Sequence, residues 1–423
     1  MRTSRRHFLG LTGGAAAAAA LRLDPAPAFA QTAPIKIGVL AAKAGVTAPV
    51  GESGLRGVQW ATDRINAAGG VLGRKIELIV EEESSPKDTV ERFRKLALQD
   101  KVEAVSGAVS TGVGLALGPV AEEMKTIWLA WDATTQKGVD ETMPKPKYSF
   151  RSCDNECEAV MGSILAARQW KGTFKTVAGI NPDYSYGRDN WAAFLAIMKK
   201  YGIQVQVVSE LWPKLGATDF TSHVAALQQA KPDLIFSCFW AGDTPIFVKQ
   251  AHGAGLTRAT KFVLTTGGGV HETLKKEFTP EGAILGYNCF YFDYAKATGL
   301  QKEFVRWHQE KFKEWPNYES DHGYFTIVAY KAAVERAAKA AGGKWPGPDA
   351  IIQALEGVEV ESLSGPRRYR EDHIMEATFF QGTTTHKNRY DFVTIEPVET
   401  MGTKQIQKPS GVGLYDWING WKV

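Results

Sequence analysis

Two neighbouring hydroxyl side chains stand where a protein can bind an anion. Ser110 and Thr111 follow the apolar stretch 102–107 after two intervening residues and open a stretch with helical character. A Ser or Thr cap leaves backbone N–H groups free at the positive end of the helix dipole, and these groups can hold a carboxylate. Capping alone would explain both residues. Their position at the end of a predicted strand favours a ligand site.

A second polar turn follows the next apolar stretch, 126–130, and contains Asp132, Ala133 and Thr134. In parallel α/β sheets the carboxyl ends of neighbouring strands share one edge, and ligands bind in the crevice outside that edge. The two turns are therefore expected to lie close together and to form one wall of a binding site.

The elements that carry these turns alternate between strand and helix. The first part of the chain predicts strands and helices in the order 35–40, 54–67, 75–80, 89–99, 102–107, a helix from 111, and 126–130. After a short strand at 148–151 the alternation resumes, from a helix at 156–169 to a strand at 261–265. This order predicts an α/β protein with two doubly wound units and a cleft between them.

The last third of the chain is less regular. An aromatic strand is expected at 287–292. It is followed by helices at 300–312, 322–340 and 348–355 and by strands at 377–381 and 389–395.

The first thirty residues have the features of an export signal. Residues 4–9 form a twin-arginine pattern, an Ala-rich apolar stretch covers 11–21, and Ala28-Phe29-Ala30 offers small residues for cleavage before Gln31. We expect twin-arginine export to the periplasm with removal of residues 1–30, rather than a retained membrane anchor. No later apolar run has the length of a membrane span.

The charge of the chain gives no case for a nucleic-acid partner. The full sequence has 50 Lys and Arg against 46 Asp and Glu. Four of the basic residues and one of the acidic residues lie in the predicted signal, so the mature chain carries a formal charge of +1. A nearly neutral domain is not typical of nucleic-acid binding.

Two groups of residues could hold a metal ion, and each favours another interpretation. The acidic run Glu81–Glu83 fits a solvated loop before a helix. Cys153 and Cys157 either form a local disulfide or remain free, and they lack the further Cys or His pair that a thiolate metal site requires. Cys238 and Cys289 lie in apolar stretches and are expected to be buried thiols. We therefore expect neither a metal nor a cofactor.

Several stretches together resemble one family. They include the opening strand 35–40, glycines 51, 54 and 57, the string Ile-Asn-Ala-Ala-Gly-Gly-Val-Leu-Gly-Arg at 65–74, and Gly365-Pro366. In these stretches the chain resembles the branched-chain amino acid type of solute-binding proteins of ABC importers, which includes the leucine/isoleucine/valine-binding and amide-binding proteins. The resemblance covers residues 34–400.

The resemblance implies the type I periplasmic binding fold, with two lobes joined by a hinge. Lobe 1 would contain 31–150 and 292–361, and lobe 2 would contain 151–291 and 362–423. The chain would cross between lobes near 149–153, 288–292 and 361–366. The protein would be a monomer that captures a small solute by hinge closure and delivers it to an ABC permease in the inner membrane, without catalysis.

By the resemblance, Ser110 and the backbone of Thr111 would seat a carboxylate of the solute. Asp132, Ala133 and Thr134 would form the neighbouring turn. From the second lobe, Tyr186 would close over the solute, and its far side would be lined by Trp240 and Thr266.

One departure from the family pattern concerns the solute. Amino-acid binders supply an acid from the second lobe for the ammonium group, but residues 265–269 read Thr-Thr-Gly-Gly-Gly. Either Asp132 supplies the charge from the first lobe, or the solute carries no ammonium. The aromatic residues Trp131, Phe239 and Trp240 are expected near the mouth of the cleft. A small amino acid, an amide and an organic carboxylate, aromatic ones included, all remain open.

Two other functions deserve comparison. The same lobes could serve a periplasmic sensor that reports to a signalling partner. An exported NADP-dependent oxidoreductase would use the glycines of 112–118, but their spacing departs from the dinucleotide fingerprint and they follow the third strand rather than the first. Helix packing explains these glycines at least as well. The sequence contains neither a Gly-x-Ser-x-Gly nor a His-Glu-x-x-His motif.

Overall fold

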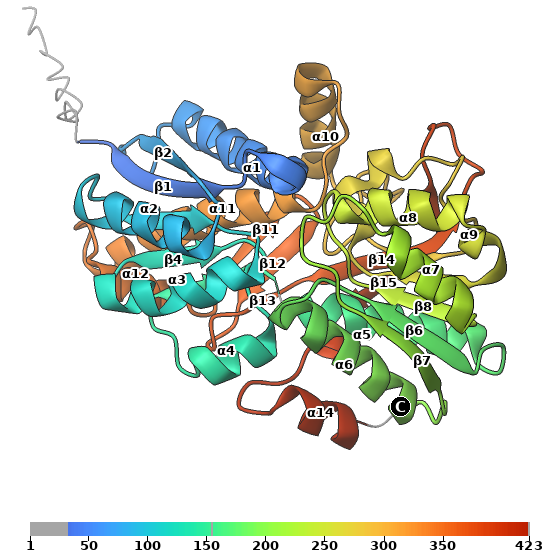
Figure 1. Cartoon of the computed structure of the whole chain (residues 1–423). Helices are drawn as coiled ribbons and strands as arrows, with labels where there is room; N and C mark the ends of the chain where they lie inside the picture. Colours follow the sequence, from blue (N-terminus) through green and yellow to red (C-terminus); the bar gives the residue numbers. More distant parts are fainter. Residues whose placement is uncertain (1–32, 154, 422–423) are drawn as a thin grey trace, which may run out of the picture. The chain divides into compact units, whose positions relative to one another are not determined.

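Two large sheets organise the residues that the computed structural model describes, 33–153 and 155–421 (Figure 1). The predicted export signal and its cleavage site lie outside these residues. One sheet has five strands in the order β2-β1-β3-β4-β5, and the other has seven in the order β15-β14-β10-β9-β8-β6-β7. No helix in the described ranges is long and apolar enough to cross a membrane.

The five-stranded sheet is parallel throughout. Its strands are β1 (Ile35–Ala41), β2 (Ile76–Glu82), β3 (Ala104–Gly107), β4 (Ile127–Ala130) and β5 (Ser149–Arg151). Its strands β3 and β4 are buried along their whole length, as expected for a parallel sheet covered on both faces. The accompanying helices are α1 (Ala48–Ala67), α2 (Pro86–Leu98), α3 (Thr111–Met124), α4 (Gln136–Thr142), α11 (Glu319–Ala340) and α12 (Pro348–Leu355). A short 3-10 turn, η1 (Gly45–Thr47), precedes α1.

The seven-stranded sheet combines a parallel part with an antiparallel edge. The parallel strands are β6 (Thr176–Ile180), β7 (Gln206–Leu211), β8 (Leu234–Ser237), β9 (Lys261–Leu264) and β10 (Ile284–Gly286). The antiparallel strands are β14 (Thr378–Thr385) and β15 (Thr394–Gly402). The helices of this part are α5 (Asn155–Trp170), α6 (Ser185–Lys200), α7 (Thr221–Ala230), α8 (Asp243–Gly253), α9 (Leu256–Ala259), the 3-10 segment η2 (Gly267–Thr273), α13 (Thr403–Ile406) and α14 (Leu414–Gly420).

A small antiparallel sheet and one more helix complete the chain. The sheet contains β11 (Glu359–Ser362), β12 (Gly365–Tyr369) and β13 (Met375–Glu376), and the helix is α10 (Gly299–Phe312). The predicted α/β class with doubly wound parallel sheets is therefore confirmed.

Two predicted strands are wrong. The aromatic stretch 287–292 is buried but contains no strand, because Asn288 adopts a left-handed backbone (φ +48°) and the chain turns from Tyr287 to Phe290. Tyr and Phe are enriched in strands, which is why the sequence predicts one here, but in the structure these side chains pack into the core without strand pairing. The stretch 389–395 is mostly a loop closed by the Asn388 side chain, and β15 begins only at Thr394.

The close packing of α1 on α11 brings the late part of the chain to the first sheet. A Cβ added to Gly57 would lie 1.9 Å from the carbonyl oxygen of Ser320, and one added to Gly323 would lie 2.1 Å from that of Gly54. The hydroxyls of Ser53 and Ser320 are 2.6 Å apart in the same contact. Glycine is therefore required for the two backbones to approach this closely.

We expect Gly57→Ala to lower the free energy of unfolding by about 1–3 kcal/mol, because the added methyl group must push the two helices apart. Thermal unfolding followed by circular dichroism measures this change. Gly299→Ala is the control, since a Cβ there has no heavy atom of another residue within 4 Å. Equal midpoints for Gly57→Ala and Gly299→Ala would contradict the proposed role of the close contact.

Candidate functional site

A small cavity lies at the carboxyl ends of strands from both large sheets. It is lined by Val109, Thr111, Asp132, Glu158, Tyr184, Tyr186, Trp240, Thr266 and Tyr318. Its volume is about 10 Å³, which is room for about one water molecule. A solute with several heavy atoms can therefore enter only after the surrounding side chains or elements separate.

The structure brings five of the predicted site residues to this cavity: Thr111, Asp132, Tyr186, Trp240 and Thr266. Three others are close in sequence but do not line it. Ala133 and Thr134 are buried behind the turn, and Ser110 contributes its backbone to another contact.

The chain's own Glu83 occupies the backbone N–H groups before α3. The N–H of Val109 donates to Glu83 Oε2 at 2.9 Å, and the N–H of Ser110 donates to Oε1 at 2.9 Å. The expectation of a solvated loop at 81–83 is wrong for Glu83, which is 5% exposed. β2 and β3 both pair in parallel with β1, so their carboxyl ends lie at the same edge of the sheet. This strand order could have predicted that Glu83, just after β2, lies beside Ser110, just after β3.

Burial has a large effect on this carboxyl group. It raises the pKa of Glu83 to about 7, although the two backbone N–H groups act in the opposite direction. The nearby carboxylates of Glu82 and Asp132 raise the pKa further.

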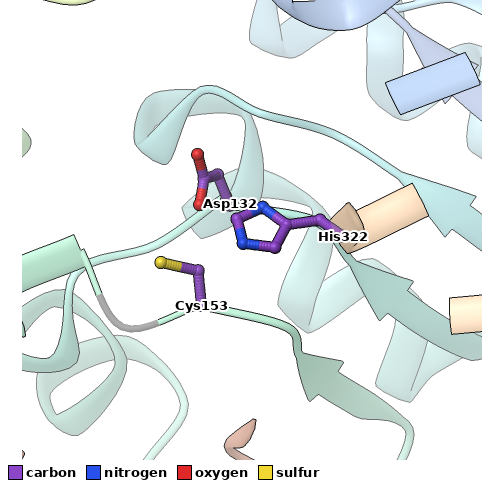
Figure 2. A group of neighbouring side chains, drawn as sticks. All are labelled: Asp132, Cys153 and His322. Carbon is purple, nitrogen blue, oxygen red and sulfur yellow. Dashed lines mark ion pairs between the residues drawn. The ribbon is translucent and has the colours of Figure 1, made fainter. Parts of the chain in front are cut away.

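Asp132 extends from the turn after β4 into the same region. Burial raises its pKa to about 6, and the adjacent side chains of Cys153 and Glu319 oppose this change. Its Oδ1 has no hydrogen-bond partner among the described residues. Asp132, Cys153 and His322 lie around one small space, as Figure 2 shows.

Glu158 is a cavity-lining acid that was not predicted from the sequence. It belongs to α5, a helix that accompanies the seven-stranded sheet. It lies in the first turns of α5, and its Oε2 accepts a hydrogen bond from the Thr266 hydroxyl at 3.3 Å. Its Oε1 is buried and unpartnered within the described part of the chain. Burial, and secondarily Asp132, raise the pKa of Glu158 well above its usual value. An acid from the second lobe was expected at the end of a strand, whereas Glu158 is supplied by a helix.

Aromatic side chains form the second wall of the cavity. The hydroxyl of Tyr186 lies 2.7 Å from that of Thr266, and Trp240 Nε1 donates to the Tyr184 hydroxyl at 3.0 Å. The hydroxyl of Tyr318 has no partner among the residues described. These rings offer apolar area with few rotatable bonds, which suits a small organic solute.

Other aromatic residues belong to the core instead. Trp131 was expected near the mouth, but it is fully buried and its Nε1 donates to Ser106 Oγ at 2.8 Å. Phe239 packs edge-on against Phe247 and does not line the cavity.

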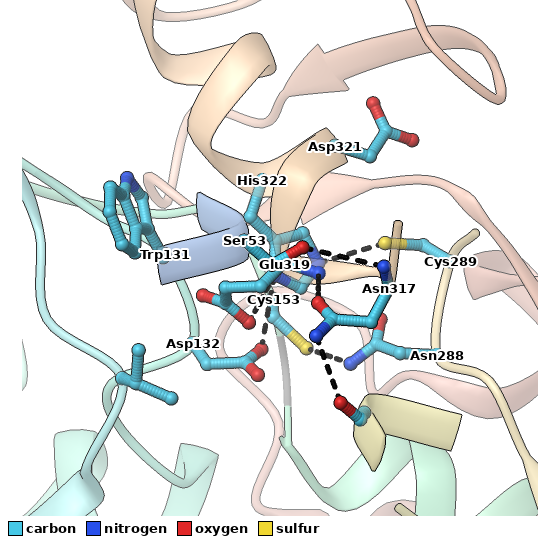
Figure 3. Close-up of polar contacts among 12 residues, drawn as sticks. Ser53, Trp131, Asp132, Cys153, Asn288, Cys289, Asn317, Glu319, Asp321 and His322 are labelled. Atoms are coloured by element: carbon cyan, nitrogen blue, oxygen red, sulfur yellow. Dashed lines mark hydrogen bonds and ion pairs between the residues drawn. The ribbon is translucent and has the colours of Figure 1, made fainter. Parts of the chain in front are cut away.

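A buried polar cluster lies behind Asp132 (Figure 3). Cys289 Sγ is 2.8 Å from His322 Nε2, and Asn288 Nδ2 donates to Cys153 Sγ at 3.1 Å. The side chain of Glu319 is fully buried, and burial together with Asp132 raises its pKa well above the usual value. Burial lowers the pKa of His322, so its imidazole is neutral.

Cys153, Cys157, Cys238 and Cys289 are buried, and none of them is in a disulfide, so the structure contains no Cys153–Cys157 disulfide. The expectation that Cys238 and Cys289 are buried thiols is confirmed.

The glycines of α3 serve close packing. A Cβ on Gly114 would lie 2.6 Å from the Ala133 carbonyl oxygen, and one on Gly118 would lie 1.5 Å from Met143 Sδ. This contact accounts for the glycines without a dinucleotide.

The raised pKa of Glu83 predicts a pH-dependent contribution to stability. Its folded pKa of about 7 lies above the ordinary 4.5, so the folded state binds this proton more tightly than the unfolded chain. The contribution is fully present below pH 4.5 and is lost as the pH rises to about 7. Thermal unfolding of wild type and Glu83→Gln should therefore show wild type losing about 1–3 kcal/mol relative to the variant between pH 4.5 and 7.5.

Glu77→Gln is the control for that comparison, because Glu77 is exposed on the same strand. A difference between wild type and Glu83→Gln that stays constant with pH would show that Glu83 does not titrate in this range.

Comparisons with known proteins identify the family of the chain. Residues 34–388 match the periplasmic binding protein family. Leu/Ile/Val-binding protein homolog 7 of Brucella melitensis is 26% identical over 365 residues, which cover 84% of this chain and 87% of that protein. Leu/Ile/Val-binding protein BraC3 of Rhizobium johnstonii is 25% identical over 349 residues, which cover 80% of this chain and 88% of that protein.

Solved structures share the fold. A solute-binding protein of an ABC transporter from Rhodopseudomonas palustris BisB5, in complex with 3,4-dihydroxybenzoic acid, has a TM-score of 0.73 and 24% identity, with coverage of 86% of this chain and 96% of that chain. The leucine-binding protein LivK from Thermotoga maritima has a TM-score of 0.71 and 21% identity, with coverage of 86% and 98%. The chain therefore belongs to the periplasmic binding protein family and is a solute-binding protein.

Proposed function

We propose that this protein is the solute-binding component of an ABC importer and that its solute presents N–H groups, as an amino acid or an amide does. The observation that carries the choice of solute is the unpartnered Oε1 of Glu158 at the cavity. A buried carboxyl oxygen needs a hydrogen-bond partner, and an ammonium or amide N–H of the solute supplies one. An ammonium group also lowers the pKa of Glu158 and so favours its ionised form when the solute is bound.

The electrostatics of the cavity support a nitrogen-bearing solute over a plain carboxylate. Asp132 and Glu158 line the cavity, and no Lys or Arg is among its described lining residues. The backbone N–H groups of Val109 and Ser110, which the resemblance assigned to a solute carboxylate, already bind Glu83. A solute carboxylate would have to displace Glu83 or use the Thr111 and tyrosine hydroxyls.

Capture by hinge closure explains the small cavity volume. We propose that the two lobes, 31–150 with 292–361 and 151–291 with 362–423, separate to admit the solute and then close around it. In this scheme Tyr186, Trp240 and Thr266 contact the solute from the second lobe. Thr111 and Asp132 contact it from the first, while Ser110, Ala133 and Thr134 hold the turns in place.

The setting of the proposed function is the periplasm. We propose that the twin-arginine signal directs export with cleavage after Ala30, and that the mature monomer delivers its solute to a permease in the inner membrane. No chemical change of the solute is part of this proposal. Relatives named as Leu/Ile/Val-binding proteins and structural neighbours titled as ABC transporter proteins support it.

A thermal-shift screen of residues 31–423 tests the class of solute. The panel pairs amino acids with their deaminated acids and decarboxylated amines, and adds short amides and hydroxybenzoates. Ligand at about 100 times its Kd should add about 2.7 kcal/mol of stability. We expect amino acids, amines or amides to raise the midpoint. Stabilisation by deaminated carboxylates alone would contradict the proposed solute class.

Glu158→Gln then tests the residue that carries the proposal. Loss of a charge-assisted hydrogen bond should weaken binding of the best nitrogen-bearing solute by about 10- to 150-fold in isothermal titration calorimetry. Asp183→Asn is the matched control, because Asp183 is an exposed acid one residue before Tyr184 and is paired with Arg188. Unchanged affinity in Glu158→Gln would remove Glu158 from the site.

A further inference from the structure

We propose that a buried polar cluster beside the cavity binds one divalent transition-metal ion of the zinc class through Asp132, Cys153, Glu319 and His322. This inference goes beyond solute binding and concerns the polar cluster behind Asp132 (Figures 2 and 3). It shares Asp132 with the solute site but does not depend on the identity of the solute.

The spacing of the side chains fits one ion. Ligand atoms of Asp132, Cys153 and His322 all lie within 4.8 Å of one another. His322 Nδ1 is 3.4 Å from Asp132 Oδ1 and 3.4 Å from Glu319 Oε2. In a tetrahedral zinc site with bonds of about 2.0–2.3 Å, neighbouring ligand atoms are about 3.3–3.8 Å apart. Only small side-chain movements are needed to reach that geometry.

Three of the four proposed ligand groups have atoms without a hydrogen-bond partner among the described residues. Asp132 Oδ1, both carboxylate oxygens of Glu319 and His322 Nδ1 are buried without a hydrogen bond to any described residue. The side chains of Glu319 and His322 are fully buried, and that of Asp132 is 7% exposed. Buried polar atoms normally have partners, so these converging atoms point to a ligand that they share.

The donor types select the class of metal. One thiol, one imidazole and two carboxylates form a mixed S, N and O set, which suits zinc and its neighbours and not calcium or magnesium. A bound thiolate requires stabilisation, and Asn288 Nδ2 donates to Cys153 Sγ at 3.1 Å.

A second layer of contacts orients the imidazole. His322 Nε2 lies 2.8 Å from Cys289 Sγ, so an Nε2–H directed at this sulfur leaves the Nδ1 lone pair for the metal. Cys289 itself is buried and does not line the cavity, so a nucleophilic Cys289–His322 pair would have no access to a solute.

The charge balance also favours a cation. Asp132, Glu319 and a Cys153 thiolate would place three negative charges in a buried space. The buried Arg367 in this region is bound to Asp321. A divalent ion offsets much of the cost of burying the remaining charges.

From the sequence alone no metal is expected, because Cys153 and Cys157 lack a further Cys or His pair. The additional ligands come from the turn after β4 and from the first turn of α11, which the fold brings beside Cys153.

The test uses the mature chain, residues 31–423, treated with a chelator and then dialysed against Zn²⁺ or Co²⁺. Elemental analysis should give one metal per chain. The Co²⁺ form should show a thiolate-to-cobalt charge-transfer band and the visible absorption of a four-coordinate site. Cys153→Ser should remove the charge-transfer band, and His322→Gln should weaken zinc binding at least about tenfold in a competition assay.

Cys157→Ser and His308→Gln are the matched controls, since each replaces a buried residue of the same type outside the cluster. Both should keep the band and the affinity. If Cys153→Ser or His322→Gln fails to fold by circular dichroism, Glu319→Gln and Asp132→Asn are tested against the same criteria. Less than 0.2 metal per chain, or binding that survives loss of the cluster residues, would overturn the proposal.

The two proposals can fail separately. The metal measurements contain no solute, and the solute screen is repeated with chelator present. Metal binding without any solute response would leave the ion site intact and contradict the importer proposal. A solute response that chelator does not change, together with no bound metal, would support the importer proposal and contradict the ion site.

Discussion

The contact between the Glu83 carboxyl group and the N–H groups of Val109 and Ser110 determines what the cleft can bind. These N–H groups form the obvious anion seat at the start of α3, and the chain fills it with its own acid. Both carboxyl oxygens are thereby satisfied, although burial raises the pKa of Glu83. What remains for a solute is acceptor capacity, in particular that of Glu158.

Three further acids are buried near this contact, and they differ in what they lack. The Glu158 carboxyl group interacts with Thr266 and Asn288, whereas Asp132 Oδ1 and both oxygens of Glu319 have no hydrogen-bond partner among the described residues. Their environment divides the site into two parts. The part beside the tyrosines offers an organic solute apolar surface and the Glu158 carboxyl oxygen as a hydrogen-bond acceptor. The part beside His322 offers an ion several converging ligand atoms. The glycine contact of α1 with α11 makes this arrangement possible, because it holds the start of α11 against the first sheet.

Strand ends could be read from the sequence, and this is why part of the site was predicted. Strand ends favoured Thr111 and Asp132, whereas Tyr186, Trp240 and Thr266 were implied by the family resemblance. All five follow predicted strands, and the cavity collects them at the shared sheet edge. The parallel α/β order of the strands followed from the same alternation of apolar stretches.

Helices supplied the residues that were missed. Glu158, Glu319 and His322 lie in the first turns of α5 and α11, and nothing in local sequence distinguishes them from exposed helical acids and histidines. Their meaning depends on contacts such as His322 with Asp132, which lie far apart in the chain. The stretch 287–292 failed for a related reason, because tertiary burial, and not strand pairing, selected its aromatic residues.

A crystal structure of residues 31–423 with a solute identified by the screen tests the central claim most directly. The decisive observation is the group bound to the N–H of Val109 and Ser110. We predict that Glu83 keeps both hydrogen bonds and that a nitrogen of the solute contacts Glu158. A solute carboxylate on the two N–H groups, with Glu83 displaced, would contradict this account of the cleft.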